Sequence, residues 1–360
     1  MKIVASRALI NGQLESNVCI ESVNGIITSI EVDSAMPTTI SGVVLPGFVD
    51  IHTHGAGGYY FSALKPEDIS IAISTHASHG TTSMLASLVT EPLESLLKQV
   101  TALVPFIGTS PIKGIHLEGP YLSHSHCGAH DSALLRTPNI AELEQLIAAS
   151  NGSIRMVTLA PELAGAIAAI EFLCSQGVVV ALGHSAADAI TTKAAIDAGA
   201  RIITHFNNGM PKLDSGENIS SASLNNADVA LELILDGVHL NQIDTERILE
   251  SAPHRIIAIT DAMSAAGSLD GDYTIGKLDV RVKDGIARLT SNGALAGSTL
   301  TMDRAFHNLI DNFGFSIPSA IHATSTLPAE KIGLVDAGSI EVGKRAELIE
   351  FTVSGSIIPV

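Results

Sequence analysis

The chain has 360 residues, of which 46% are hydrophobic and only 4% aromatic, so its core must be mostly aliphatic. Its 37 acidic and 20 basic residues give a net charge of −17, which disfavours nucleic acids and anionic membranes as partners because neither is attracted over long range. This length suits one large α/β barrel with a small appendage, since such barrels often occupy about 250 residues.

Cysteine usage and the start of the chain indicate the cellular compartment. The three cysteines, Cys19, Cys127 and Cys174, are odd in number and form no Cys-x-x-Cys pair, which favours a reducing compartment. The start, MKIVASRALINGQ, has no small-residue cleavage site after a sustained apolar run, so we expect a strand and not a signal peptide. No segment has about 18 or more uninterrupted apolar residues, and no transmembrane helix is expected. We therefore predict a cytoplasmic protein.

The two ends of the chain share one pattern. Residues 1–47 alternate like short antiparallel strands, with Asn-Gly turns at Asn11 and Asn24. Residues 336–360 alternate in the same way, and neither end is long enough for a core of its own. We predict that both ends pair into one small, discontinuous β-sandwich beside the main domain.

Residues 48–335 repeat an apolar or β-branched run followed by a helical stretch. The eight runs are FVDIHTH (48–54), TTSMLASL (81–88), KGIHLE (113–118), IRMVTLA (154–160), VVVALGH (178–184), RIITHF (201–206), ALELILDG (230–237) and IIAITDA (256–262). In the intervening segments alanines and leucines fall three and four residues apart, which is typical of helices. Eight such units predict a (β/α)8 TIM-type barrel.

Two further features complete the prediction for this domain. Residues 273–296 have the pattern of a hairpin-like insertion with a Lys-Asp-Gly turn. The alternative architecture, an open doubly wound sheet, would usually have fewer strands and a glycine-rich phosphate turn. No Gly-x-Gly-x-x-Gly follows a strand here, so the barrel is favoured.

Metal-competent side chains follow five of the eight predicted strands. They are His52 and His54 on the first strand, Glu118 on the third, His184 on the fifth, His205 on the sixth and Asp261 on the eighth. Residues i and i+2 of a strand point to the same side, so the two histidines of the first strand can converge on one ion. The carboxyl ends of barrel strands meet at one mouth. The pattern predicts a site for one or two divalent ions, with zinc as the first candidate and iron, manganese or cobalt as alternatives.

Such a cluster suits metal-assisted hydrolysis. Divalent ions lower the pKa of bound water toward about 7 and polarise a scissile carbonyl. Asp261 is the candidate proton shuttle, because a carboxylate beside the water can take its proton and pass it to the leaving group. Glu118 could bridge two ions, one held by the histidines of the first strand and the other by His184 and His205.

These motifs carry a resemblance to known enzymes. The histidines after the first, fifth and sixth strands and the aspartate after the eighth resemble the amidohydrolase superfamily. More narrowly, the chain resembles N-acetylglucosamine-6-phosphate deacetylases in LPGFVDIHTHGAGG, GIHLEGPYL, GAH, LGHS, THFNNGMP, LDGVHL, TDAMSAAG and LAGSTLTM. Hydantoinase-like members have a lysine at the end of the fourth strand, which IRMVTLAPE lacks, and nucleoside-deaminase-like members have a His-x-x-Glu that LGHSAADA lacks.

The resemblance implies an enzyme that removes acetate from the 2-acetamido group of an amino-sugar 6-phosphate, with N-acetylglucosamine 6-phosphate as the first candidate. It implies Glu118, His184 and His205 as ligands of the main ion and Asp261 as the proton shuttle. The substrate-binding residues that it implies are Ala129 and His130 at the acetamide carbonyl, Asn208, Gly209, Asp236 and His239 around the sugar and phosphate, and Leu295, Ala296 and Gly297 over the sugar. It also implies a homodimer in which His239 reaches the neighbouring site.

Two segments depart from the family pattern. The loop before GAH is usually basic, and here residues 123–127 are SHSHC. The loop after the sixth strand usually carries an arginine for the phosphate, whereas PKLDSGENIS places Gly216 there and offers Lys212 as its nearest cation. The alternatives are therefore N-acetylgalactosamine 6-phosphate or an unphosphorylated amino sugar as substrate, an N-acyl amino acid amidohydrolase, and a non-catalytic barrel.

Overall fold

Eight parallel strands form the centre of the computed structural model, which describes residues 1–360. In spatial order they are β5 (Phe48–Thr53), β8 (Thr81–Leu88), β9 (Ile112–Glu118), β10 (Ile154–Leu159), β11 (Val179–Leu182), β12 (Ile202–Ile203), β13 (Ala230–Ile234) and β14 (Ile256–Ile259). The main chain closes this sheet into a ring, because Asp261 donates a hydrogen bond to the His52 carbonyl at 2.8 Å and His54 donates to the Ala262 carbonyl at 2.9 Å. The predicted TIM-type barrel is confirmed.

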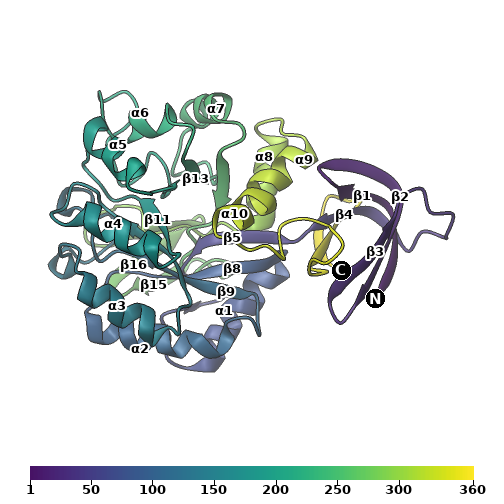
Figure 1. The fold of residues 1–360 in the computed structure, drawn as a ribbon, viewed down its shortest axis with the longest axis horizontal. Coiled ribbons are helices and arrows are strands. Elements are labelled where there is room, and N and C mark those ends of the chain that lie inside the picture. The colour runs from purple at the N-terminus through teal and green to yellow at the C-terminus, as the bar shows by residue number, and fades with distance from the viewer.

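Helices cover the outside of the barrel, and one follows each of its strands (Figure 1). They are α1 (Pro66–Ser78), α2 (Leu93–Leu103), α3 (Ile140–Ala149), α4 (Ala166–Ser175), α5 (Ala189–Asp197), α6 (Ile219–Leu224), α7 (Gln242–Ser251) and α8 (Met302–Asp311), followed by α9 (Ile317–Ile321) and α10 (Leu327–Lys331). Asn139, Asn218 and Asn241 begin three of them, and each side chain accepts hydrogen bonds from the first turn. One continuous cluster of buried apolar side chains joins the strands to these helices, so they share a single core. None of the helices combines the length and hydrophobicity that a membrane span requires.

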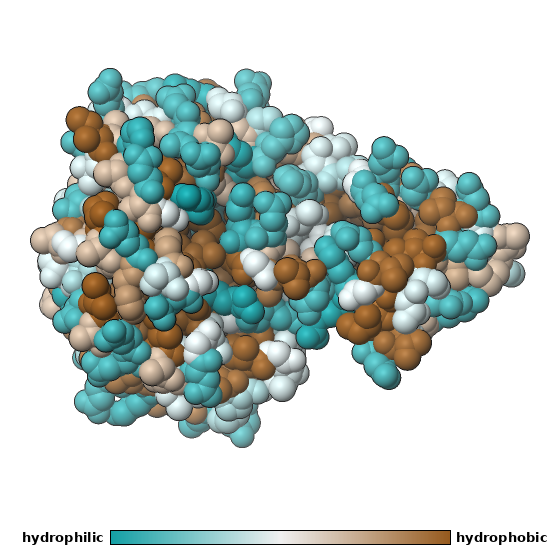
Figure 2. Space-filling model, in the orientation of Figure 1, coloured by the Kyte–Doolittle hydropathy of each residue, from teal (hydrophilic) through white to brown (hydrophobic).

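Both chain ends form a separate sheet domain, as predicted, and the two termini lie together in it (Figure 1). Its single six-stranded sheet has the order β19 (Ile357–Pro359), β18 (Leu348–Phe351), β4 (Ile40–Pro46), β1 (Lys2–Ile10), β2 (Gln13–Val23) and β3 (Ile26–Glu31). Asn11 and Asn24 adopt φ of 50° and 52°, the left-handed conformation that tight Asn-Gly hairpin turns need. Hydrophobic groups gather on this domain in Figure 2, and Val23 and Val353 are among its exposed side chains.

A small antiparallel sheet follows β14 and lies near the barrel mouth. It consists of β15 (Gly271–Ile275), β16 (Leu278–Lys283) and β17 (Ile286–Leu289), and a second small hairpin of β6 (Gly55–Ala56) and β7 (Tyr59–Tyr60) follows β5. The inner side chains of the three-stranded sheet, including Val280 and Leu289, pack with Met263 in a separate apolar cluster. This packing anchors the insertion to the segment directly after Asp261.

His76 of α1 is fully buried against the first barrel strand. Its Nε2 lies 3.0 Å from Thr53 Oγ1 and 3.1 Å from the Gly55 carbonyl oxygen. Burial lowers the pKa of His76 to about 4. In an unfolded chain a histidine titrates near pH 6.5, so between about pH 6.5 and 4 the unfolded chain binds a proton that the folded protein does not, and stability falls as the pH falls.

We expect His76 to contribute up to about 3 kcal/mol to the loss of unfolding free energy between about pH 7 and 4. The variant His76→Gln, which has no titrating ring, should show a smaller pH dependence, although its stability at pH 7 falls as well. Denaturant unfolding at several pH values measures how the unfolding free energy of the wild type and of the variant changes with pH. Equal slopes for the variant and the wild type would contradict this assignment.

Candidate functional site

Six metal-competent side chains meet at the carboxyl end of the barrel. They form two groups, one of His52, His54 and Asp261 and the other of Glu118, His184 and His205, and the ligand atoms within each group lie within 4.8 Å of one another. All six residues are buried. The structure therefore brings together every metal ligand that the sequence predicted, together with the predicted proton shuttle.

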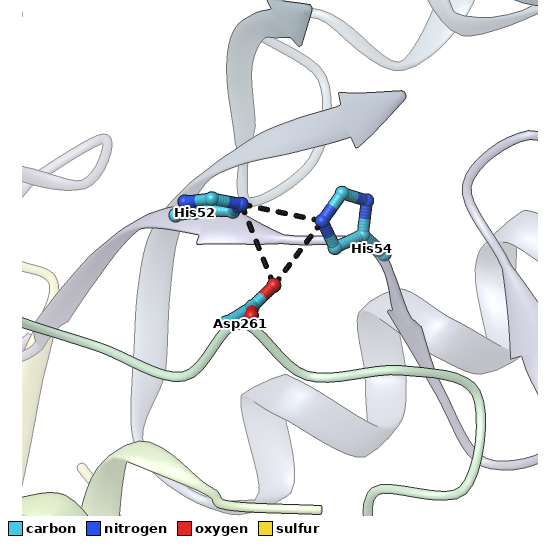
Figure 3. A group of neighbouring side chains, drawn as sticks. All are labelled: His52, His54 and Asp261. Carbon is cyan, nitrogen blue, oxygen red and sulfur yellow. Dashed lines mark hydrogen bonds and ion pairs between the residues drawn. The ribbon is translucent and has the colours of Figure 1, made fainter. Parts of the chain in front are cut away.

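The first group joins the two ends of the ring. Figure 3 shows His52 of β5, His54 directly after that strand and the aspartate after β14 pointing toward one another. His52 Nε2 lies 3.2 Å from His54 Nε2, and Asp261 Oδ1 lies 3.4 and 3.3 Å from these two atoms. Three ligand atoms from two strands thus surround one point.

The second group contains the carboxylate that ends β9. Glu118 Oε1 lies 3.1 Å from both His184 Nε2 and His205 Nε2, and these two nitrogens are 3.0 Å apart. The other carboxylate oxygen, Oε2, lies 3.3 Å from His54 Nε2. Glu118 therefore reaches both groups.

The hydrogen bonds of the outer ring nitrogens define the tautomers of these histidines. His184 Nδ1 lies 2.7 Å from the His126 carbonyl oxygen, and His205 Nδ1 lies 3.2 Å from the Asn208 carbonyl oxygen. A carbonyl only accepts hydrogen bonds, so each Nδ1 carries a proton. In the neutral rings the two Nε2 lone pairs then face each other across 3.0 Å, an arrangement that a cation between them would stabilise.

The partner of the outer ring nitrogen also defines the tautomer of His52 in the first group. Both groups fit a divalent cation. His52 Nδ1 lies 3.1 Å from Glu232 Oε2, so in the neutral ring its Nε2 lone pair also faces inward. Tetrahedral ligands about 2.0–2.1 Å from zinc are separated by about 3.3 Å. The ligand atoms here are separated by 3.0 to 3.4 Å. Imidazole and carboxylate donors at this spacing fit zinc and its neighbours.

Three of these residues lie in strained backbone conformations just beyond the ends of their strands. His184, His205 and Asp261 have φ of 46°, 29° and 47°, in the left-handed region that costs residues other than glycine about 1–3 kcal/mol. Main-chain hydrogen bonds hold them there: Ser123 donates to the His184 carbonyl at 2.8 Å, and Ser298 donates to the Asp261 carbonyl at 2.8 Å. The left-handed backbone conformation directs each side chain toward the barrel mouth.

The buried charges support one another. Burial alone would raise the pKa of Glu118, but His52 and His130 outweigh it and hold that pKa well below its ordinary value. Burial would lower the pKa of His52, yet Glu118 and Asp261 raise it well above its ordinary value. Burial likewise opposes ionisation of Asp261, but His52 and His54 lower its pKa to about 2. Asp261 is therefore an ionised carboxylate that can accept a proton.

A cavity of about 240 Å³ opens above the six ligands. It is lined by His54, Val89, Glu118, Gly128, Ala129, His130, His184, His205, Asn208, Gly209, Ile234, His239, Asp261, Ile275, Ala294, Leu295 and Gly297. Most of the predicted substrate residues are in this lining. Asp236 and Ala296 are not: Asp236 Oδ2 accepts from His239 Nδ1 at 2.7 Å, and Ala296 is buried in the apolar cluster of the insertion. His239 lines the cavity of its own chain.

His130 has the opposite tautomer to the ligand histidines. The Thr90 amide donates to His130 Nδ1 at 3.3 Å, so the neutral ring carries its proton on Nε2. That atom faces the site, 3.3 Å from Glu118 Oε2. Burial lowers the pKa of His130 despite the attraction of Glu118, which favours the neutral ring. His130 is thus arranged to donate a hydrogen bond into the cavity.

Two buried carboxylates beneath the ligands were missed by the sequence analysis. Glu232 accepts from His52, and Asp50 accepts from the Thr260 hydroxyl at 2.6 Å. Burial raises the pKa of Asp50 to about 7, although the hydrogen bonds from Thr260 oppose this. Both are acidic residues inside fully buried strands, FVDIHT and ALELI, and this is the signal that could have identified them. The apolar lining residues, such as Ile234 and Ile275, carry no comparable signal.

Known proteins resemble this chain over most of its length. The sequence profile of the amidohydrolase family matches residues 43–359. An N-acetylgalactosamine-6-phosphate deacetylase of Escherichia coli O157:H7 is 38% identical, covering 91% of this chain and 88% of that protein, and an N-acetylglucosamine-6-phosphate deacetylase of Vibrio furnissii is 35% identical, covering 87% and 80%.

Among solved structures, a variant of the N-acetyl-D-glucosamine-6-phosphate deacetylase of Mycobacterium smegmatis in complex with N-acetyl-D-glucosamine-6-phosphate superposes with a TM-score of 0.95. It is 36% identical and covers 99% of this chain and 96% of that chain. The likeness therefore extends over the barrel and the sheet domain together.

Zinc should stabilise the folded protein after chelator treatment, because the ligands converge only in the folded state. At a free zinc concentration about 100 times the Kd the gain is about 2.7 kcal/mol, which would raise Tm by several degrees. The variant Glu118→Gln should lose most of this gain. Glu347→Gln, which changes a carboxylate bonded to Lys113 and Ser83 far from the ligands, is the matched control. A wild-type response to zinc in Glu118→Gln would contradict the ligand assignment.

Proposed function

Because this chain belongs to the amidohydrolase family, we propose that it hydrolyses the 2-acetamido group of N-acetylglucosamine 6-phosphate and releases acetate. It is a hydrolase that acts on an amide bond. The observation that carries the proposal is the meeting of six metal-competent groups, one of them the ionised Asp261, beneath one cavity whose lining includes the hydrogen-bond donor His130. Deacetylases of amino-sugar 6-phosphates match almost the whole chain, which supports this substrate class.

We propose zinc as the cation, with one or two ions. Glu118, His184 and His205 would hold the main ion, and His52 and His54 would hold a second ion with Glu118 between the groups. When bound, a divalent cation supplies Lewis acidity, which lowers the pKa of water and polarises a carbonyl oxygen. The tautomers of His52, His184 and His205 support this assignment, since their Nε2 lone pairs face inward in the neutral rings.

Asp261 would act as the proton shuttle. Its carboxylate is ionised, because its pKa is lowered to about 2, and it lies in the cavity lining. It can take a proton from the attacking water as the water oxygen bonds to the acetamide carbon. The same proton then passes to the amide nitrogen as the C–N bond breaks, so that the free amine and acetic acid, which ionises to acetate, leave. Main-chain hydrogen bonds from Ser298 and to His52 hold the backbone at this residue.

His130 would hold the acetamide carbonyl oxygen. Its Nε2–H faces the cavity, and the neighbouring Ala129 and Gly128 also line it. A neutral ring with a fixed donor can stabilise negative charge on that oxygen as it develops. The hydrogen bond from the Thr90 amide holds the proton on Nε2.

The phosphate would bind near His239, Asn208 and Gly209. No lysine or arginine lines the cavity, so the phosphate would have to rely on the His239 ring and on neutral donors. Asp236 accepts from His239 Nδ1, which orients the ring. The amine of Lys212 is hydrogen-bonded to the Asn207 carbonyl oxygen and is absent from the lining.

The assembly and the location are proposals as well. We propose a homodimer and a cytoplasmic protein, and the three free cysteines support a reducing compartment. Sedimentation equilibrium tests the dimer, and a single species of monomer mass would refute it. Fractionation of the native host tests the location, and recovery of the protein outside the cytoplasm would refute it.

A substrate panel tests the function. We expect the zinc-loaded protein to release acetate from N-acetylglucosamine 6-phosphate with a kcat/KM roughly 10- to 100-fold above that for N-acetylglucosamine, because hydrogen bonds to a charged group contribute about 1.5–3 kcal/mol. N-acetylgalactosamine 6-phosphate belongs in the panel, because a 38% identical relative is named for that epimer. A higher kcat/KM for it would reassign the sugar. No acetate from either phosphorylated sugar would refute the proposal.

Asp261→Asn should lower kcat by roughly 10²- to 10⁴-fold, the usual contribution of a general acid and base. KM should change little, because the amide keeps the shape of the carboxylate. Zinc should still bind to Glu118, His184 and His205, and elemental analysis of the purified variant checks this. A variant with zinc bound and the kcat of the wild type would remove Asp261 from the mechanism.

A further inference from the structure

Glu232 is a charged residue in an unusual place. It lies in the middle of β13, whose other residues are alanine, leucine and isoleucine, and it is fully buried. Burying an ionised carboxylate costs several kcal/mol unless hydrogen bonds compensate. A residue with this cost in the interior of a barrel needs a reason to be there.

One oxygen of this carboxylate accepts from both ligand groups. Glu232 Oε2 lies 3.1 Å from His52 Nδ1 and 3.2 Å from the backbone nitrogen of His205. His52 belongs to one ligand group and His205 to the other. The Glu232 backbone adds a third contact, because its carbonyl accepts from the Phe206 amide at 2.7 Å. Glu232 therefore holds the chain on both sides of the strained turn at His205 and also one ring of the opposite group.

We propose that Glu232 is a positioning residue of the metal centre: it keeps the proton of His52 on Nδ1, so that Nε2 stays free as a ligand, and it ties the His205 turn to that ring. The proposal rests on the metal centre of the proposed function. Glu232 does not line the cavity, so it acts through the ligands and not on the substrate. Carboxylates behind ligand histidines orient the ring and raise its basicity.

His52 is the ligand histidine whose orientation a side chain controls. The outer nitrogens of His184 and His205 are bonded to main-chain carbonyls, and His54 Nδ1 has no hydrogen-bond partner. Main-chain acceptors cannot be removed by substitution, whereas Glu232 can. On the other side, the ring of His116 packs edge-on against His52 with centroids 4.6 Å apart, but it makes no hydrogen bond to it.

Zinc affinity of two variants tests the proposal. Glu232→Gln keeps the shape but weakens the acceptor, and Glu232→Leu removes the acceptor. With zinc titrated against a chromophoric chelator, we expect an affinity about 10- to 100-fold weaker for the glutamine variant, and weaker still for the leucine variant. Glu347→Gln, the control distant from the site, should bind as the wild type does. Wild-type zinc affinity in a folded Glu232→Leu protein would overturn the proposal.

A second measurement needs no substitution. In zinc-loaded wild-type protein with ¹⁵N-labelled histidines, we expect His52 to carry a proton on Nδ1 that exchanges slowly with water. A His52 ring without a proton on Nδ1 would overturn the proposal, whether or not the variants fold. Neither measurement uses a sugar, so a protein that passed both tests and released no acetate would refute the proposed function and leave the role of Glu232 intact.

Discussion

The structure depends on one constraint, the inward convergence of imidazole lone pairs at the barrel mouth. His184 and His205 present their Nε2 atoms to each other at 3.0 Å, and His52 and His54 do so at 3.2 Å. Rings placed in this way repel one another unless a proton or a cation lies between them. The protonated outer nitrogens, the left-handed strand ends and the buried carboxylates all act to keep this arrangement in place.

The same constraint separates two kinds of histidine in one cavity. His52, His184 and His205 carry a proton on the outer nitrogen because a carbonyl or a carboxylate accepts from it, whereas His130 carries its proton on the inner nitrogen because a backbone amide donates to the outer one. The group bonded to Nδ1 thus decides whether a histidine presents a lone pair or an N–H group to the site. The net charge of −17 repels an anionic sugar phosphate over long range, so binding of the phosphate must rely on local donors.

The sequence predicted the features that repeat or end at strand boundaries. Eight apolar runs indicated the barrel, and the polar residue after a run indicated the ligands, because parallel strands of a barrel place their carboxyl ends at one mouth. The acidic Glu232 stands out in its apolar strand, but the sequence could not predict that it contacts His52, since this contact joins strands 180 residues apart and has no spacing rule. Nor could it identify the His126 carbonyl as the partner of His184, because a main-chain acceptor has no residue type. Asp236 was assigned to the cavity, but it lies behind His239 and orients that ring.

Anomalous diffraction from a zinc-soaked crystal, recorded on both sides of the zinc absorption edge, would test the central claim most directly. The account predicts a strong peak among Glu118 Oε1, His184 Nε2 and His205 Nε2, with a second peak between His52 and His54 at higher occupancy of the metal. A map with no peak among these atoms, or with these rings turned away from one another, would contradict it.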